Sequence, residues 1–228
     1  MQPMTPVIKN LIIINVIFYL ATMVIGSGGV LPLPYLTEQF GAFYPGSPMF
    51  RPWQIITHMF MHSHTGITHI FFNMFALYMF GVGLERVWGS KRFLIYYLVC
   101  GLGGFFLHEL VNAIEIYRLT GEIFPATEAF NSPQEALQYY YIPVVGASGA
   151  VFGILLGFGM LFPNTQIFLL FPPIPIKAKV FVFIYGAIEL FSAFGSSGSN
   201  IAHFAHLGGM LFGYVLLKKW QRDRDIFF

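Results

Sequence analysis

Residues 145–162 read VGASGAVFGILLGFGMLF, and this stretch decides the fold. It holds no charged residue, and its apolar side chains run on without the alternation of a half-buried strand. Its 18 residues approach the roughly 20 that a helix needs to cross the hydrocarbon core of a bilayer. The stretch therefore predicts a membrane-spanning helix.

The composition of the whole chain agrees with this prediction. The 228 residues are 56% hydrophobic and only 10% charged, with a mean hydropathy of +0.68, whereas soluble domains carry about 25% charged residues. In lipid, a spanning backbone has to satisfy its own hydrogen bonds as a helix or as a closed barrel. Because the apolar runs are long and unalternating, we expect an all-α, polytopic membrane protein.

Apolar runs of this kind divide the chain into six expected spans within one membrane domain, residues 1–228. The first has no small-residue cleavage site after it, so we expect it to be a retained helix. An outer loop, 26–68, and an outer insertion, 114–143, separate the first two spans and the third from the fourth. The six expected spans are 7–25, 69–84, 93–113, 145–162, 180–194 and 201–217.

The positions of the cationic residues predict the orientation. With six crossings and a cytoplasmic N-terminus, only Arg51 and Arg118 fall outside, and an excess of Lys and Arg marks cytoplasmic segments. Both termini are therefore expected in the cytoplasm. The net charge of +2 and the scattered cations argue against a nucleic-acid partner. The ten inner cations are Lys9, Arg86, Lys91, Arg92, Lys177, Lys179, Lys218, Lys219, Arg222 and Arg224.

Two residues that could perform chemistry are expected at the same depth. Ser148 falls in the first turn of its span, and His206 lies five residues into 201–217, or roughly 7 to 8 Å at 1.5 Å per residue. Both spans begin at the outer face. A nucleophile and its base have to come within hydrogen-bond reach, so this pair is a candidate catalytic site.

Glycines supply a means of bringing the two helices together. Gly149, Gly153 and Gly157 form a small-residue face on one span, while Gly209 and Gly213 form another on the last span. Small faces allow helix backbones to approach closely in a membrane.

Two glycines also flank the candidate nucleophile. Gly146 and Gly149 lie on either side of Ser148, and the free N–H groups of a helix N-terminus can stabilise a developing oxyanion.

Three motifs together resemble the rhomboid family of intramembrane proteases. They are Gly146-Ala147-Ser148-Gly149, the run Ala205-His206 with Gly209 and Gly213, and His69-Ile70-Phe71-Phe72-Asn73 at the start of the second span. The resemblance implies a six-helix bundle in a bacterial inner membrane, without a metal or cofactor. Its partners would be the lipid bilayer and transmembrane protein substrates cleaved near the outer face.

The same resemblance implies roles for individual residues. Ser148 would attack the substrate and His206 would accept its proton. His69 and Asn73 would form the oxyanion hole with the backbone N–H of Ser148, and they lie at i and i+4 on one helical face. Neither the oligomeric state nor the physiological substrate follows from the sequence.

No acidic residue is expected to complete a triad. Glu85 is expected at the inner end of the second span, Glu109 near the outer end of the third, and Glu189 near the middle of the fifth. The sequence therefore favours a Ser/His dyad.

Several positions depart from the family pattern. Phe152 replaces a frequent Tyr beneath the histidine ring, and Gln54 follows Trp53 where an Arg is frequent. The loop histidine is shifted to His62, and the outer insertion is longer than expected.

Two other functions stay open at this point. A histidine-rich, metal-dependent membrane enzyme is one, because His203 and His206 are spaced i, i+3 and because His108-Glu109 begins a near miss to the zincin motif, with Asn112 at the second ligand position. Four further histidines lie close together at His58, His62, His64 and His69. A noncatalytic rhomboid-like binder of membrane helices is the other, although such proteins typically lack the serine or the histidine.

Overall fold

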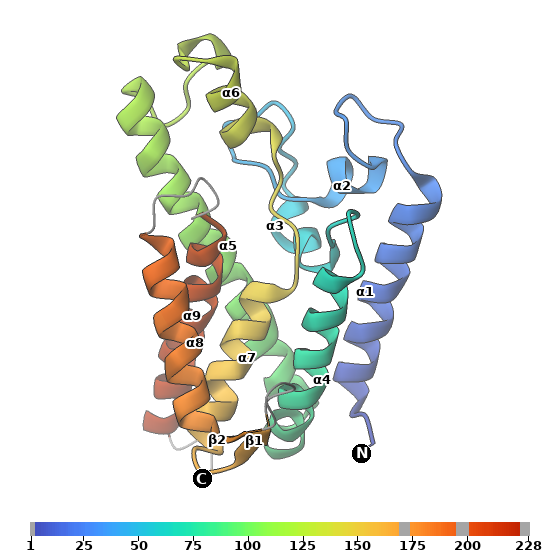
Figure 1. Ribbon diagram of the computed structural model, residues 1–228, viewed down its shortest axis with the longest axis vertical. Coiled ribbons are helices and arrows are strands. Elements are labelled where there is room, and N and C mark those ends of the chain that lie inside the picture. Colours follow the sequence, from blue (N-terminus) through green and yellow to red (C-terminus); the bar gives the residue numbers. More distant parts are fainter. Residues whose placement is uncertain (1–2, 169–173, 195–200, 224–228) are drawn as a thin grey trace.

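The chain is mostly helical in the computed structural model, which describes residues 3–168, 174–194 and 201–223. Figure 1 shows the long helices running roughly along one axis, with the short elements gathered at its two ends. The elements in chain order are α1 Pro6–Ile25, α2 Tyr35–Phe40, α3 Gln54–Thr57, η1 His58–Phe60, α4 Thr68–Trp88, α5 Ser90–Thr120, η2 Thr127–Ala129, α6 Pro133–Ala136, η3 Leu137–Tyr141, α7 Ser148–Leu161, β1 Gln166–Phe168, β2 Pro175–Lys177, α8 Ala178–Ala193 and α9 Ile201–Arg222.

The six long helices lie on the six ranges expected from hydropathy, and each begins within a few residues of the expected start. The largest difference is at the end of α5, which continues through the first residues of the outer insertion to Thr120. No proline interrupts it there, and it ends where Gly121 adopts the left-handed conformation with φ 79°. The helix therefore extends beyond its apolar part into the polar cap, as the upper end of Figure 1 shows.

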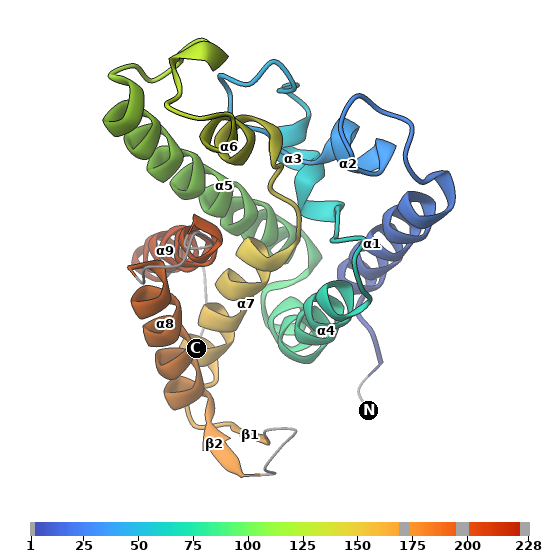
Figure 2. The same ribbon diagram turned by 45° about the horizontal axis from the view of Figure 1, so that its top comes forward.

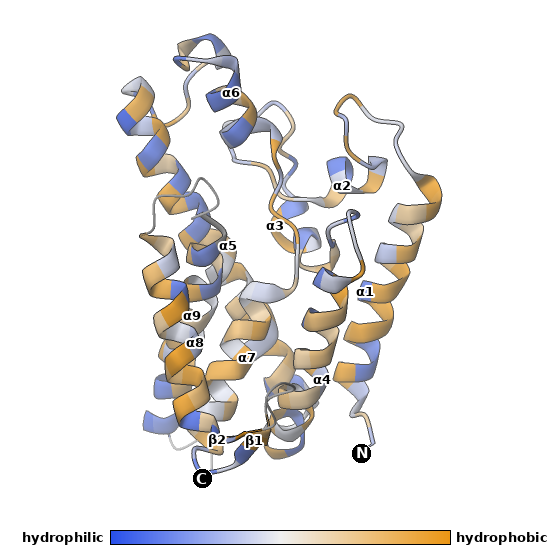
Figure 3. Cartoon of the chain, viewed as in Figure 1, coloured by the Kyte–Doolittle hydropathy of each residue, from blue (hydrophilic) through white to orange (hydrophobic). Residues whose placement is uncertain are grey.

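The helices have the apolar surfaces of a membrane protein. Within the described residues, α1, α4 and α5 are long and apolar enough to cross a membrane, while α7 is apolar but has only 14 residues. Figure 3 shows hydrophobic residues along the helix bodies and hydrophilic ones mainly towards both ends. A short antiparallel hairpin, which pairs Gln166 of β1 with Lys177 of β2, was not expected and lies beside the start of α8.

The central element is α7. It packs against α4, α5, α8 and α9, while α1 packs on the outside against α4; Figure 2 shows this arrangement from the end that bears α6. A short helix that begins in the middle of a bundle is protected by its neighbours, so its N-terminus can face a polar cavity without exposing backbone to lipid.

Glycines allow α5, α7 and α9 to approach closely. A Cβ on Gly209 of α9 would collide with the carbonyl oxygen of Gly149 of α7, and one on Gly104 of α5 would lie 2.6 Å from the carbonyl oxygen of Ala205. A Cβ on Gly213 would lie 2.6 Å from the hydroxyl of Tyr96. These contacts bring the backbones that carry the candidate nucleophile and base close together.

A buried carboxylate joins the start of α1 to the end of α4. Glu85 accepts hydrogen bonds from the backbone N–H groups of Val7 and Ile8, both at 3.0 Å, and from the hydroxyl of Ser90 at 2.7 Å. The hydroxyl of Thr5 donates to the same carboxylate. Glu85 thus satisfies amide groups that the first turn of α1 would otherwise leave unpaired, at the inner end of the second span where it is expected.

The outer insertion packs on the first outer loop. Tyr140 stacks on Tyr44 with ring centroids 5.8 Å apart, and its backbone carbonyl accepts a hydrogen bond from Ser47 at 2.5 Å. An antiparallel bridge between Ala42 and Val144 extends this contact towards α7. The insertion and the loop therefore share a small hydrophobic core of their own, which comprises Tyr44, Ile116, Phe130, Ala136 and Tyr140.

Candidate active site

Ser148 is the first residue of α7, so its side chain sits at a helix N-terminus in the interior of the bundle. The chain enters through Gly146, whose φ of 129° is rarely adopted by other residues. The N–H of Gly146 donates to the carbonyl of His58 at 2.9 Å. A Cβ there would also lie 3.0 Å from the Cε1 and Nε2 atoms of His69. The conformation favours glycine at this position, and a side chain there would also press on the His69 ring.

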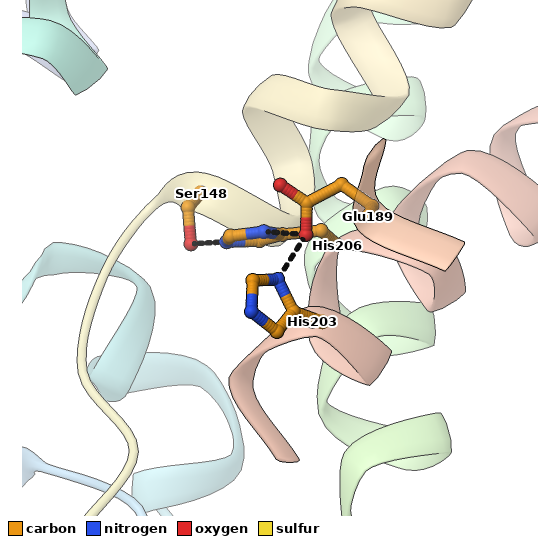
Figure 4. A network of polar contacts seen from close by, with 4 residues as sticks. All are labelled: Ser148, Glu189, His203 and His206. Atoms are coloured by element: carbon orange, nitrogen blue, oxygen red, sulfur yellow. Dashed lines mark hydrogen bonds and ion pairs between the residues drawn. The ribbon is translucent and has the colours of Figure 1, made fainter. Parts of the chain in front are cut away.

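The structure brings Ser148 and His206 into direct contact. The Nε2 atom of His206 lies 2.9 Å from the Oγ atom of Ser148 (Figure 4). Both side chains are partly buried, and the two residues are 58 positions apart in the chain. This is the distance that a general base needs to take a proton from a serine hydroxyl.

Phe152 holds the histidine ring from one face. Its ring lies parallel to that of His206, with centroids 4.2 Å apart and planes inclined by 10°. Phe152 is four residues after Ser148, so both side chains project from the same side of α7. The ring stack expected at this position is present, although the hydroxyl of a tyrosine is not.

An acidic residue does reach the histidine, and the expectation of a dyad without an acid is wrong in this respect. The Oε2 atom of Glu189 lies 2.9 Å from the Nδ1 atom of His206 and 2.7 Å from the Nδ1 atom of His203 (Figure 4). Glu189 is buried, with 8% of its surface exposed. Sequence reasoning missed it as a site residue.

The position of Glu189 near the end of its span could have indicated its contact with His206. The helices α8 and α9 are consecutive, and Glu189 lies four residues before the end of α8 while His206 lies five residues after the start of α9. Because the two helices pack against each other, these similar distances of four and five residues place the two side chains at about one level. The error was to count Glu189 as a mid-span residue.

Of the two residues expected at the oxyanion hole, His69 lies beside the entry to α7, and Asn73 follows it by four residues on α4. The Nδ1 atom of His69 accepts a hydrogen bond from the backbone N–H of Ser63 at 3.2 Å. A neutral His69 therefore carries its proton on Nε2, the atom that lies against Gly146. The amide of Asn73 is buried and uses one N–H to bond the carbonyl of His69 at 2.9 Å.

Gln54 organises the outer loop in the position where the family frequently has an arginine. It is fully buried, and its Oε1 atom accepts from the backbone N–H of Arg51 at 2.9 Å. Its amide N–H groups lie 3.2 to 3.4 Å from three backbone carbonyls, those of Glu38, Gln39 and Met49. Its own carbonyl bonds the ring of His58 at 2.9 Å. An uncharged amide thus ties the loop together.

Burial keeps two loop histidines neutral. It lowers the pKa of His58 and that of His62 to about 4. The His62 ring lies edge-on to His69, with centroids 5.1 Å apart, and both of its nitrogens are buried without a hydrogen-bond partner in the described part of the chain.

The histidines expected for a metal enzyme do not converge on one site. Among the described residues, one group has ligand atoms close enough to hold a metal ion, and it consists of Glu189, His203 and His206, all within 4.8 Å of one another. His58 packs instead against Phe105, and His108 lies beside Glu109 with 3.7 Å between Nε2 and Oε1. The structure therefore offers one possible three-ligand group, which overlaps with the serine–histidine pair.

Comparison with known proteins agrees with this geometry. The Rhomboid domain family matches residues 50–220. Rhomboid protease GluP of Bacillus subtilis (strain 168) is 34% identical over 166 residues, which cover 71% of this chain and 25% of that protein. The putative rhomboid protease YdcA of the same organism is 28% identical over 173 residues, which cover 75% of this chain and 70% of that protein.

A third relative extends the similarity to another genus. Rhomboid protease AarA of Providencia stuartii is 28% identical over 172 residues, which cover 72% of this chain and 54% of that protein. The chain thus spans about a quarter of GluP and about half of AarA. Since the family match takes in α4 to α9 and every residue of the serine–histidine site, this polytopic membrane protein belongs to the rhomboid family.

Proposed function

We propose that the protein is an intramembrane serine endopeptidase that cleaves transmembrane segments of membrane proteins near the outer face of the bilayer. The observation that carries the proposal is the 2.9 Å contact between the Oγ atom of Ser148 and the Nε2 atom of His206. Nucleophile and base are already in hydrogen-bond contact, so the first proton transfer requires no rearrangement of either helix.

In the first step, Ser148 attacks the carbonyl carbon of the scissile peptide bond. His206 takes the hydroxyl proton on Nε2, and the carbonyl oxygen becomes an oxyanion. When the tetrahedral intermediate collapses, the peptide C–N bond breaks and His206 gives the same proton to the leaving amine. The new amino end of the substrate departs, and an acyl-enzyme is left on Ser148.

In the second step, a water molecule hydrolyses the acyl-enzyme. His206 removes a proton from the water and returns it to Ser148 Oγ as the ester bond breaks. The site lies at the N-terminus of α7, below the polar loop and insertion. Water reaching it from the outer face would not have to cross the apolar part of the bundle.

The oxyanion would be held by groups that surround the start of α7. The backbone N–H of Ser148 is free of an intrahelical partner because it belongs to the first turn. The side-chain donors in this proposal are Nε2–H of His69, which lies against Gly146, and the second N–H of Asn73, whose first N–H bonds the carbonyl of His69. Donors fixed in this way stabilise the charge without reorganising during the reaction.

The proposed topology follows from the same arrangement. With Ser148 towards the outer face, the start of α1 and the β1–β2 hairpin lie at the inner end of the bundle, together with Lys9 and Lys177. This is the orientation that the positive-inside rule favours, with both termini in the cytoplasm and the protein in a bacterial inner membrane.

The alternatives make different predictions for one experiment. The purified protein in proteoliposomes would be mixed with a fluorogenic transmembrane substrate and, separately, with a serine-reactive fluorophosphonate. Wild type should cleave and become labelled, whereas Ser148→Ala should do neither. Equal labelling of both proteins would contradict the nucleophile assignment. Binding of the substrate without cleavage by wild type would indicate a noncatalytic binder, and activity lost to a chelator would indicate a metal enzyme.

A further inference from the structure

One carboxylate oxygen lies within hydrogen-bond distance of two histidines at the site. Oε2 of Glu189 lies within hydrogen-bond distance of Nδ1 of both His203 and His206, at 2.7 and 2.9 Å (Figure 4). A protonated carboxyl oxygen has one hydrogen and could donate to only one of these nitrogens. An ionised carboxylate accepts from both. The shared oxygen therefore favours an ionised Glu189 facing two Nδ1–H groups.

The position of Glu189 on its helix sets it apart from its neighbours. α8 exposes large apolar side chains such as Phe183 and Phe191, which are 75% and 79% accessible. Glu189 is turned the other way, against α9. An ionisable group inside a membrane bundle is costly and usually has a functional partner, and here the partner is the base of the proposed reaction.

The tautomer of His206 follows from this contact. When Nδ1 carries the proton that is donated to Glu189, neutral His206 has its lone pair on Nε2. Nε2 is the atom that lies 2.9 Å from the Oγ atom of Ser148. The alternative tautomer would present an N–H to the serine and could not accept its proton.

We propose that Glu189 is a positioning residue that acts through His206, so that Ser148, His206 and Glu189 form a functional triad. The inference rests on the proposed function. Glu189 fixes the Nδ1–H tautomer and the orientation of the ring, and its negative charge stabilises the imidazolium formed when Nε2 takes the serine proton. The proton moves from Ser148 to His206 and then to the leaving amine, while Glu189 stays ionised throughout.

His203 helps to hold the Glu189 carboxylate beside His206. Its Nδ1–H occupies the second acceptor direction of Oε2 and comes from the helical turn of α9 just before His206. The two histidines hold the carboxylate from adjacent turns. Glu189 thereby crosslinks α8 to α9 at the level of the nucleophile.

The test compares Glu189→Gln with wild type and with Glu109→Gln, which alters an equally buried acid on α5 whose carboxylate bonds Asn112. Gln keeps the size of Glu and a hydrogen-bonding oxygen but removes the charge. Glu189→Gln should lower kcat by about 10²- to 10⁴-fold with little change in KM. Glu109→Gln should retain wild-type kcat. A purely structural role would instead lower the melting temperature and leave kcat of the folded fraction intact.

A second readout is independent of turnover. In protein labelled with ¹⁵N-histidine, the nitrogen shifts of His206 should report the Nδ1–H tautomer in wild type and a shift towards Nε2–H in Glu189→Gln. Glu189→Asp, which keeps the charge, should restore part of the lost activity. It also serves as the test variant if Glu189→Gln does not fold.

The outcomes separate this inference from the proposed function. If Ser148→Ala is inactive while Glu189→Gln matches wild type, the triad is overturned and the serine–histidine mechanism stands. If Ser148→Ala keeps activity, the proposed function itself fails. Loss of wild-type activity on chelation would also overturn the triad, because Glu189, His203 and His206 would then serve as metal ligands.

Discussion

Phe152 and His206 lie face to face, with ring centroids 4.2 Å apart, so that the imidazole is held between an aromatic ring, a serine and a carboxylate. Aromatic stacking of this kind is worth about 0.5 to 1.5 kcal/mol. Phe152→Ala should free the imidazole to rotate and lower kcat by about 2- to 10-fold, since 1.4 kcal/mol corresponds to a factor of ten. Phe152→Tyr keeps the ring and should stay near wild type. Equal kinetics for the alanine variant would show that the stack does not orient the base.

Gly209→Ala should be more damaging, because its new methyl group would meet the carbonyl oxygen of Gly149. Overpacking of this kind typically costs about 1 to 3 kcal/mol, and here the backbones that carry Ser148 and His206 would also be pushed apart. We expect a lower melting temperature together with slower fluorophosphonate labelling of Ser148. Gly186→Ala is the control, since its Cβ would lie 3.3 Å from the flexible end of Met210. Similar stability of the two variants would contradict close glycine packing as the cause.

Asn73→Ala tests the oxyanion hole. Loss of one such donor costs about 10²- to 10³-fold in kcat in a serine protease, so turnover should fall by about 10- to 1,000-fold, with KM nearly unchanged. Asn15→Ala is a matched control, because Asn15 is also buried and also donates to the carbonyl four residues earlier, that of Leu11. If both variants keep wild-type turnover, the amide of Asn73 serves packing alone.

Glu85→Ala should destabilise the bundle from its inner end. The change removes a carboxylate that accepts from Thr5, Val7, Ile8 and Ser90, and each buried donor left unpaired costs about 1 to 3 kcal/mol. A loss of at least about 2 kcal/mol is expected, measured by denaturant titration in detergent. Ser90→Ala removes only one of the four donors and should cost less. Equal losses in the two variants would mean that Glu85 does not anchor α1.

Acid should weaken the outer loop through His62. Its pKa is lowered to about 4 in the folded protein by burial, whereas an unfolded histidine titrates near 6.5. Between these values the unfolded chain binds a proton that the folded protein does not. The contribution of neutral His62 to the free energy of unfolding is therefore complete above about pH 6.5. It is lost as the pH falls towards 4, with a slope of up to about 1.4 kcal/mol per pH unit.

The measurement is the melting temperature between pH 4.5 and 7.5 for wild type and for His62→Gln. The variant should lose less stability on acidification than wild type. His64→Gln alters an exposed histidine in the same loop and should follow the wild-type curve. Parallel curves for wild type and His62→Gln would rule out His62 as the source of the acid sensitivity.

The six long helices could be predicted because runs of apolar residues mark where a chain can cross lipid. Each long helix starts near the expected residue. The end of α5 could not be predicted in the same way. Hydropathy reports only the apolar part of a helix, whereas this helix continues until Gly121. The hairpin between α7 and α8 was missed for a related reason. Its pairing depends on two strands separated by a proline-rich connection, which carries little periodic signal.

The site was predictable in the residues that define the motifs, and less so in those that support them. The pairing of Ser148 with His206 followed from their common depth. Glu189 was missed because its level was judged from the middle of its span and not from its distance to the following helix. Gln54 was recognised as a departure from the family, but only the fold shows that its amide reaches the backbone carbonyls of the loop.

The hydrogen bond from the N–H of Gly146 to the carbonyl of His58 has a mechanical consequence. It joins the segment that Gln54 holds together to the residue two positions before Ser148, at a glycine whose φ of 129° few other residues could adopt. The outer loop is therefore joined to the start of α7 through buried residues, without passing through any membrane helix. A displacement of His58 would reach Ser148 over a path of only two residues.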